Sequence, residues 1–194
     1  MKLRIALVAA AAGIGMIAAP LAMAKPFKWT SASDIPTLDI HSQNNALGNG
    51  VHAAVYDALV YYDSKTFKPE PQLATSWREI SPTQMRFTLR SGVKFSDGSP
   101  MSADDVVFSI MRAMGKTSNY AVFTQGIDRV VKVNDNTVDF MMKGPNPVLL
   151  NQLTELRIMS KAWAEKNRSL EAKDIRTKDE TFAHRNAMGT GQYM

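Results

Sequence analysis

The sequence predicts an α/β fold, because strand and helix periods follow one another along the chain. Residues 85–90 alternate apolar and polar side chains, which is the period of a strand with one buried face. Residues 102–114 carry apolar side chains at helical spacing behind an N-terminal capping pattern. Residues 131–142 alternate again on both sides of Asn134-Asp135-Asn136, which indicates a hairpin. Such an order of strands and helices is typical of a layered α/β domain.

The first 24 residues predict a secretory signal peptide. Lys2 and Arg4 precede an apolar run from Ile5 to Ala19, and the small-residue site Ala22-Met23-Ala24 ends the segment. A membrane anchor is the alternative, because the apolar run is nearly long enough to span a bilayer. The richness in alanine and glycine and the small-residue end favour cleavage, with Lys25 as the first mature residue.

The next segment, up to residue 71, is expected to hold the first elements of the mature chain. Asp34-Ile35-Pro36 ends an extended stretch, and the Gly48-Asn49-Gly50 cluster predicts a flexible joint. The expected elements are a strand at 28–33, a helix at 51–59, a short strand at 60–62 and a surface loop with two prolines at 65–71.

The segment from 71 to 112 carries the densest set of strand, turn and capping signals in the chain. Met85, Phe87 and Leu89 lie on one face of the expected strand, and the Asp-Gly turn at 96–100 must reverse or bend the chain. Ser102 precedes Asp105 by three positions, which is a capping box at the start of the helix. This segment predicts a strand, a turn and a helix, and nothing in it indicates chemistry.

The last third of the chain predicts shorter elements. Asn146-Pro147 is expected to start a helix, with asparagine as the cap and proline at the first helical position. Residues 115–120 are expected to be irregular, 156–160 a strand, 161–167 a short helix and 168–185 a surface helix or loop.

Charge and cysteine content limit the partners and the compartment. The formal net charge of +5 falls to +3 once Lys2 and Arg4 are removed, because the leader holds no acidic residue. This charge is too small and too scattered to predict a nucleic-acid partner. The absence of cysteine excludes disulfides and a lipid-modified cysteine. The periplasm, with the protein free in solution, is therefore the expected compartment.

One enzymatic alternative deserves a test. Ser91-Gly92-Val93-Lys94 matches the S-x-x-K pattern of serine acyl-transfer enzymes related to the penicillin-binding proteins. That chemistry requires the serine at a helix start, so that the lysine one turn later reaches its hydroxyl. The four residues are instead expected to lie in a strand that ends with glycine, where positions three apart face opposite sides, so the sequence favours a protein that is not an enzyme.

Metal and phosphate sites are not predicted. His41, His52 and His184 are the only histidines and lack the i, i+4 spacing of paired metal ligands. Gly115-Lys116-Thr117 is similar to the end of a phosphate-binding loop, but Ile110 stands where that loop requires glycine. The sequence therefore predicts no metal and no cofactor.

Six ordered segments closely resemble the family 5 extracellular solute-binding proteins of ABC transporters, the class that binds peptides, dipeptides and nickel. The central ones are LATSW at 73–77, LRSGVKFSDG at 89–98 and SADDVVFSI at 102–110. The others are TLDIHSQ at 37–43, VYDALVYYD at 55–63 and GTGQY at 189–193. Ile40 and Gln192 depart from the family pattern, which usually has proline at each of these positions.

The resemblance implies a periplasmic binding protein type II-like fold. Members of the family have two lobes and more than twice this length, so we expect the chain to be an N-terminal part of lobe I that includes its inserted α/β subdomain. The expected division is a signal peptide at 1–24, the first segment of lobe I at 25–48, the lobe I subdomain at 49–180 and a truncated return to lobe I at 181–194.

The resemblance also implies a function. The expected role is capture of a peptide or other small solute for the membrane permease subunits of an ABC transporter, with nickel, haem, opines and sugars as open alternatives. A stand-alone binding or chaperone-like module is a further alternative. By position, Asn44, Ala46 and Tyr120 are the candidate ligand-binding residues. The simpler interpretation is that Asn44 is a loop residue and that Tyr120 is a packing aromatic.

Overall fold

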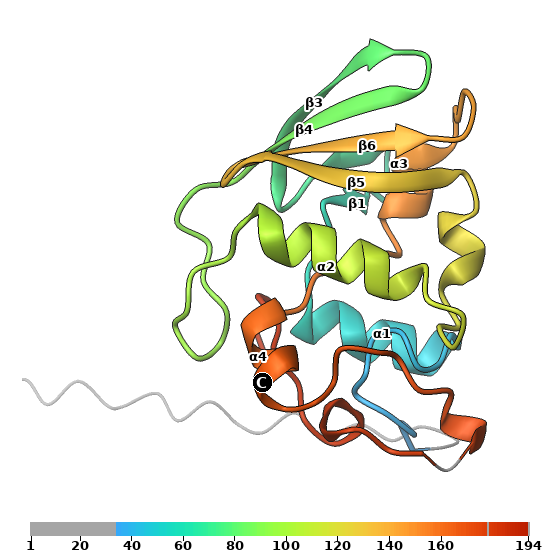
Figure 1. Ribbon diagram of the computed structural model, residues 1–194, viewed down its shortest axis with the longest axis vertical. Helices are drawn as coiled ribbons and strands as arrows, with labels where there is room; N and C mark the ends of the chain where they lie inside the picture. Colours follow the sequence, from blue (N-terminus) through green and yellow to red (C-terminus); the bar gives the residue numbers. More distant parts are fainter. Residues whose placement is uncertain (1–33, 178, 194) are drawn as a thin grey trace, which may run out of the picture. The chain divides into compact units, whose positions relative to one another are not determined.

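A four-stranded antiparallel sheet covers one side of helix α2 (Ala103–Ala113) in the computed structural model, which describes residues 34–177 and 179–193 (Figure 1). The spatial order of the strands is β3-β4-β6-β5. Their bounds are Ala74–Ser81 for β3, Gln84–Leu89 for β4, Ile127–Asn134 for β5 and Thr137–Met142 for β6. The strand predicted at 85–90 and the hairpin predicted across Asn134-Asp135-Asn136 are thereby confirmed.

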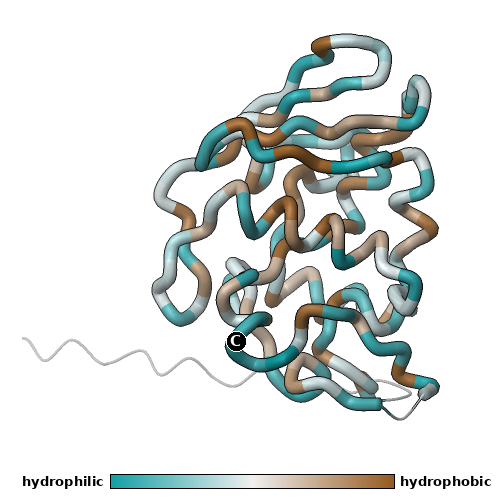
Figure 2. Tube along the Cα trace, in the orientation of Figure 1, coloured by the Kyte–Doolittle hydropathy of each residue, from teal (hydrophilic) through white to brown (hydrophobic). Residues whose placement is uncertain are grey.

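The alternation of side chains decides which face of the sheet is buried. Phe87 and Leu89 on β4 are buried, as are Val138 and Phe140 on the neighbouring strand. The rings of Phe87 and Phe140 meet edge to face, with centroids 5.1 Å apart. Figure 2 shows hydrophobic stretches along β5 and along α2, where the helix packs against the sheet.

Helix α2 begins where the sequence predicts. Ser102 Oγ accepts a hydrogen bond from Asp104 N, and Asp105 Oδ2 accepts one from Ser102 N at 2.8 Å. This reciprocal pattern is the predicted capping box. The helix is buried on two faces, because Ala103, Val106, Ile110 and Ala113 pack in the main core, whereas its polar residues contact the chain segments on the side away from the sheet.

Helix α1 (Ala46–Val55) begins five residues earlier than the sequence predicts. Asn45 caps it by accepting a hydrogen bond from Gly48 N at 2.7 Å. The expected joint at Gly48-Asn49-Gly50 therefore lies inside the helix, and this prediction was wrong. The cap and the burial of His52 and Val55 outweigh the low helix propensity of two glycines.

Strands β1 (Val60–Tyr62) and β2 (Pro69–Pro71) pair antiparallel. The strand at 60–62 is confirmed, but the end of the predicted loop at 65–71 is an edge strand. Proline is tolerated there because the outer edge of the pair needs no backbone donor.

Two further predictions were wrong in detail. Helix α3 (Leu149–Leu153) begins after Asn146-Pro147, and Asn146 Oδ1 accepts a hydrogen bond from Val148 N instead of capping the helix. Residues 156–160 form no strand beyond one bridge between Ala58 and Arg157, because Met159 bonds to a side chain of α2. The predicted short helix is confirmed as α4 (Lys161–Lys166).

The segment 168–185 is irregular but is not a surface element throughout. It contains the 3-10 turns η2 (Ile175–Thr177) and η3 (Phe182–His184). Ser169, Ala172, Ala183 and His184 are nevertheless buried. The sequence did not predict this burial, because charged residues dominate the segment. The leader at 1–24 and the strand expected at 28–33 lie outside the described residues.

The GTGQY segment packs directly on the end of α1. Gly191 N donates to Val55 O at 3.0 Å, and Tyr193 N donates to Ala54 O at 3.3 Å. These bonds satisfy two of the carbonyl groups that a helix C-terminus leaves free. A Cβ atom on Gly189 would lie 2.1 Å from Val55 O, so only glycine fits there.

We expect Gly189→Ala to lower the free energy of unfolding by about 3 kcal/mol or more, because the new methyl group has to displace the end of α1. Gly144→Ala is the matched control, since no atom lies within 4 Å of its Cβ position. Urea denaturation followed by circular dichroism measures both. Equal stability of the two variants would contradict the close contact.

Candidate functional site

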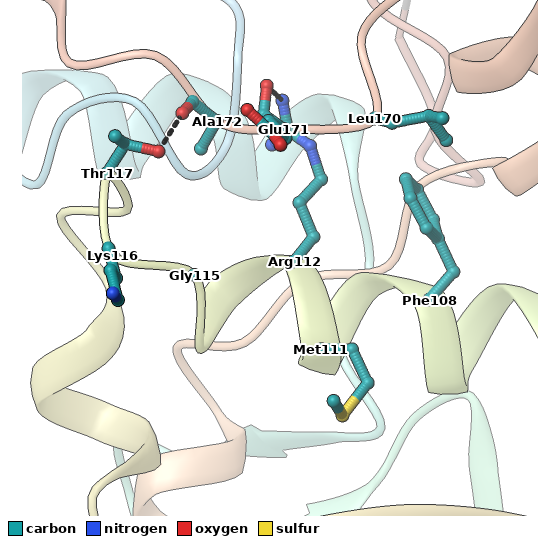
Figure 3. Close-up of a pocket in the computed structure, with 9 residues that line it drawn as sticks. All are labelled: Phe108, Met111, Arg112, Gly115, Lys116, Thr117, Leu170, Glu171 and Ala172. Carbon is teal, nitrogen blue, oxygen red and sulfur yellow. Dashed lines mark hydrogen bonds between the residues drawn. The ribbon is translucent and has the colours of Figure 1, made fainter.

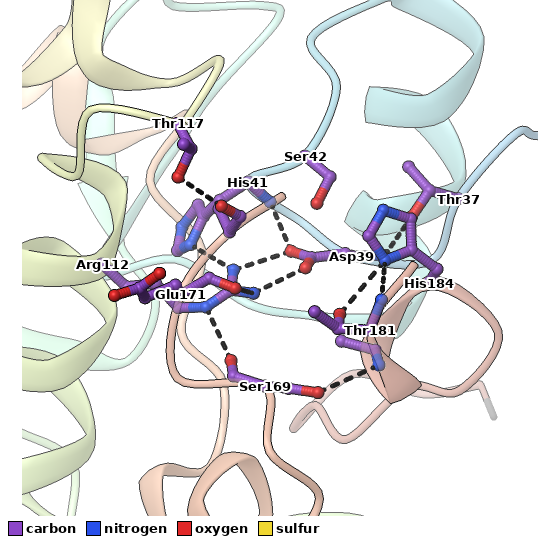
Figure 4. Close-up of polar contacts among 12 residues, drawn as sticks. Thr37, Asp39, His41, Ser42, Arg112, Thr117, Ser169, Glu171, Thr181 and His184 are labelled. Atoms are coloured by element: carbon purple, nitrogen blue, oxygen red, sulfur yellow. Dashed lines mark hydrogen bonds and ion pairs between the residues drawn. The ribbon is translucent and has the colours of Figure 1, made fainter. Parts of the chain in front are cut away.

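A buried arginine joins three separate parts of the chain (Figure 4). Arg112 on α2 donates to both carboxylate oxygens of Asp39, with Nη1 at 2.7 Å and Nη2 at 2.5 Å. Its Nε donates to Ser169 O at 3.0 Å and its Nη2 to Glu171 O at 3.1 Å. The Arg112 and Asp39 side chains are fully buried. The contact therefore fixes the loop that leads to α1 and the segment at 169–171 against α2.

His41 completes this cluster as a neutral side chain. Burial first and then the charge of Arg112 lower its pKa to about 3, although Asp39 acts in the opposite direction. Arg112 Nη1 lies 3.1 Å from His41 Nδ1, which accepts the hydrogen bond when the imidazole is neutral. His41 Nε2, Ser42 Oγ and Gln43 Oε1 are buried and have no hydrogen-bond partner among the described residues.

Two other polar residues of α2 hold the C-terminal part of the chain in the same way. Ser109 Oγ donates to Met159 O at 3.2 Å and accepts from Met159 N at 3.0 Å. Asp105 Oδ1 accepts from Lys161 N at 2.9 Å. Asp105, Ser109 and Arg112 therefore form a buried polar stripe along α2, which bonds to the backbone of residues 159, 161, 169 and 171.

The structure connects two of the three predicted site residues through a side chain that the sequence did not indicate. Tyr120 Oη donates to Asn49 Oδ1 at 2.5 Å, and Asn49 Nδ2 donates to Asn44 Oδ1 at 2.9 Å. Asn44 and Ala46 are exposed at the start of α1, whereas Tyr120 is only 2% exposed. Tyr120 is thus a buried residue that positions Asn49 and, through it, Asn44.

Tyr120 is held on two sides by aromatic rings. Its ring centroid lies 5.7 Å from that of His41, edge to face, and 5.7 Å from that of Phe123. The Arg112 cluster and the Asn44 network are therefore in direct contact through His41 and Tyr120. No spacing in the sequence predicts this connection, because Asn49 and Tyr120 are 71 positions apart.

A groove of about 570 Å³ lies on another part of the surface (Figure 3). Phe108 and Met111 on α2 line one side and Leu170 lines the other, with Lys116 near one end. Arg112 reaches the groove, but its donors already bond to Asp39, His41 and backbone carbonyl groups. None of the predicted site residues lines this groove, so we do not place the ligand there.

The S-x-x-K pattern lacks the geometry of acyl transfer. The strand expected at 91–94 was wrong, because β4 ends at Leu89 and Ser91 lies in an exposed turn after it. Asn136 Nδ2 donates to Ser91 Oγ at 3.3 Å. Gly92 in the same turn has a φ of 75°, which interrupts any helix at this point. Within residues 34–177 and 179–193, no group of three or more histidine, aspartate or glutamate side chains could hold a metal ion. No helix of the described part is long and apolar enough to cross a bilayer.

The model of the bacterial extracellular solute-binding proteins, family 5, matches residues 68–194. The chain belongs to this family. The glutathione-binding protein GsiB of Pectobacterium atrosepticum is 33% identical over 152 residues, which cover 76% of this chain and 29% of that protein.

Solved structures of this family share the fold. The binding protein AgaA of A. tumefacien R10 in complex with agropinic acid has a TM-score of 0.69 at 26% identity. DppA of Helicobacter pylori in complex with the peptide STSA has a TM-score of 0.65 at 26% identity. The matched regions cover 81% and 80% of this chain, but only 30% and 33% of those chains. This chain therefore has the periplasmic binding protein type II fold, and it corresponds to only part of the length of these relatives.

We expect Arg112→Met to lower the free energy of unfolding by about 3–5 kcal/mol, because the substitution leaves the Asp39 carboxylate buried without its partner. Arg185→Met, which breaks an exposed ion pair with Glu180, should unfold like the wild type. The double variant Asp39→Leu/Arg112→Met should be more stable than Arg112→Met in the same urea titration. A double variant less stable than Arg112→Met would contradict this account.

The same pair predicts a dependence of stability on pH. Burial by itself would raise the pKa of Asp39, but the hydrogen bonds and charge of Arg112 hold it at about 2, below the ordinary 3.8. A lowered pKa in the folded state stabilises the fold above the ordinary value, and this contribution is lost as pH falls through about 2. The difference in free energy of unfolding between the wild type and Asp39→Asn should therefore shrink from pH 4 to pH 2. A constant difference would refute the prediction.

Proposed function

We propose that this protein is the periplasmic solute-binding component of an ABC importer and that it captures peptides. The match of the family model to residues 68–194 carries the proposal. The relatives that bind glutathione and the peptide STSA support peptides as the solute class. The proposal includes a cleaved leader at 1–24 and delivery of the solute to membrane permease subunits, which supply the coupling to ATP.

The proposed chemistry is binding without a reaction. An extended peptide offers the same backbone donors and acceptors whatever its side chains, so main-chain hydrogen bonds can hold many peptides with similar affinity. Two lobes that close over the ligand by a hinge bury most of its surface. In this scheme residues 25–48, 49–180 and 181–194 all belong to the lobe I side of the cleft.

We place the lobe I part of the binding site at Asn44, Ala46 and Tyr120. Asn44 and Ala46 are exposed, whereas the Tyr120 hydroxyl lies under them at Asn49. The nearby unpaired polar atoms of residues 41–43 support this location, because buried polar groups normally bond to a partner, a water or a ligand. Tyr120 would act by holding Asn49 and Asn44 in place more than by direct contact.

The test is calorimetric titration of the full-length protein with tri-alanine and with glutathione. We expect Asn44→Ala to weaken binding by about 1–2 kcal/mol, as expected for the loss of one or two ligand hydrogen bonds. Its melting temperature should stay near that of the wild type, since the side chain is exposed. Asn151→Ala, another exposed asparagine on α3, is the matched control. Equal affinities of the two variants would remove Asn44 from the site.

A further inference from the structure

The hairpin tip, residues 62–68 between β1 and β2, carries an exposed aromatic residue in a strained backbone conformation. Phe67 has a φ of 56°, which lies in the left-handed region that favours glycine and is costly for a bulky side chain. Phe67 is also 69% exposed, so burial within this chain does not offset the strain. Backbone strain of this kind persists mainly where a function requires it. Packing within the described part of the chain therefore does not account for a phenylalanine at this position.

The backbone of the hairpin tip is closed by its own hydrogen bonds. Phe67 N donates to Asp63 O at 2.9 Å, and Asp63 N donates to Lys68 O at 3.0 Å. Asp63 Oδ1 accepts hydrogen bonds from Lys65 N at 2.8 Å and from Thr66 N at 2.7 Å. An aspartate that bonds to the backbone two and three residues later is a common way to fix a turn. These bonds hold Phe67 in its outward position.

Phe67 is part of a cluster of exposed aromatic rings. Tyr62 is 45% exposed, and its ring meets that of Phe67 edge to face, with centroids 6.4 Å apart. Tyr61 is 43% exposed and points to the opposite face of β1, because successive strand residues alternate. Single exposed apolar residues are ordinary on a protein surface, whereas a group of them indicates a contact surface.

The charges on the hairpin tip indicate what it contacts. Lys65 and Lys68 are exposed, and among the described residues neither has a carboxylate within ion-pair distance. The Asp63 carboxylate bonds to the backbone of its own turn. Glu70 is half-buried and lies farther back, opposite Tyr61 in the strand register. The outer end of the tip therefore presents two ammonium groups beside aromatic rings.

We propose that the hairpin tip binds the surface of an anionic phospholipid bilayer. Aromatic rings are favoured at the level of the lipid headgroups, and lysines beside them bind the phosphate groups of anionic lipids. Lys65 and Lys68 lie on both sides of Phe67 in the chain, so the ring can enter the headgroup layer while both ammonium groups stay at its surface. This contact goes beyond the proposed function, because no solute takes part in it.

The test is co-sedimentation of the full-length protein with sucrose-loaded vesicles. The leader at 1–24 is left out of every variant, because its apolar run would itself bind a bilayer. Vesicles of equimolar phosphatidylcholine and phosphatidylglycerol are compared with vesicles of phosphatidylcholine alone. The wild type should bind the anionic vesicles more tightly than the neutral ones, and added salt should weaken that binding because it screens the lysines.

The variants separate the ring from the charges. Phe67→Gly should lower the partition coefficient about tenfold, and its melting temperature should equal or exceed that of the wild type because glycine adopts this φ without strain. Lys65→Gln/Lys68→Gln should lower binding to anionic vesicles by about 10- to 30-fold and leave the weaker binding to neutral vesicles unchanged. Lys94→Gln/Lys116→Gln removes two other exposed lysines and should bind like the wild type.

Each outcome either supports or overturns the membrane contact. Loss of vesicle binding by Phe67→Gly without loss of stability supports it. A wild type that sediments with neither kind of vesicle overturns it and leaves a protein partner for the tip. Equal loss in Tyr193→Ser, which removes another ring from a residue that is 64% exposed, also overturns it, because the binding would then not be specific to the tip. Calorimetric solute binding should be the same in all these variants, so a failed vesicle test leaves the proposed function standing.

Discussion

The bidentate ion pair between Arg112 and Asp39 is the contact on which the rest of the structure depends. It lies at 0% side-chain exposure and joins the loop before α1 to the polar face of α2. The remaining donors of Arg112 bind the backbone of residues 169 and 171, so one guanidinium fixes three segments that are far apart in sequence. A buried ion pair is weak evidence for stability when compared with an apolar replacement, but removal of one partner is severe. Its role here is to determine which segments meet.

Helix α2 can pack against both the sheet and the C-terminal segments because one face is apolar and the other carries polar side chains. Val106 and Ile110 pack in the core with the sheet, and Ser109 and Arg112 bond to chain segments that have no regular hydrogen-bond partners of their own. An irregular segment can be buried only if its backbone groups are satisfied. The polar stripe of α2 does this on both sides of α4, at Met159 and at residues 169 and 171. In Figure 1 the strand-paired sheet lies above α2, and the segments that bond to Ser109 and Arg112 lie below it.

The proposed ligand site is built on this framework. His41 contacts both Arg112 and Tyr120, and Tyr120 positions Asn49 and Asn44. The ion pair between Arg112 and Asp39 thus also fixes His41 and Tyr120, the buried residues beneath the exposed start of α1.

The sequence by itself determined the local elements of this protein and its family. The alternation at Met85, Phe87 and Leu89, the capping box at Ser102 and the asparagine turn at 134–136 specify their structures, because each depends on neighbours in the chain. The ordered motifs also pointed to the solute-binding family.

Tertiary structure decided what depends on distant partners. Helix α1 forms across two glycines because Asn45 caps it and its face is buried. Residues 156–160 form no regular strand because Ser109 Oγ bonds to the backbone of Met159. The charged segment after residue 168 is partly buried because Arg112 donates hydrogen bonds to its carbonyl groups. The link from Tyr120 to Asn49 could not be read from spacing, since it joins residues that only folding brings together.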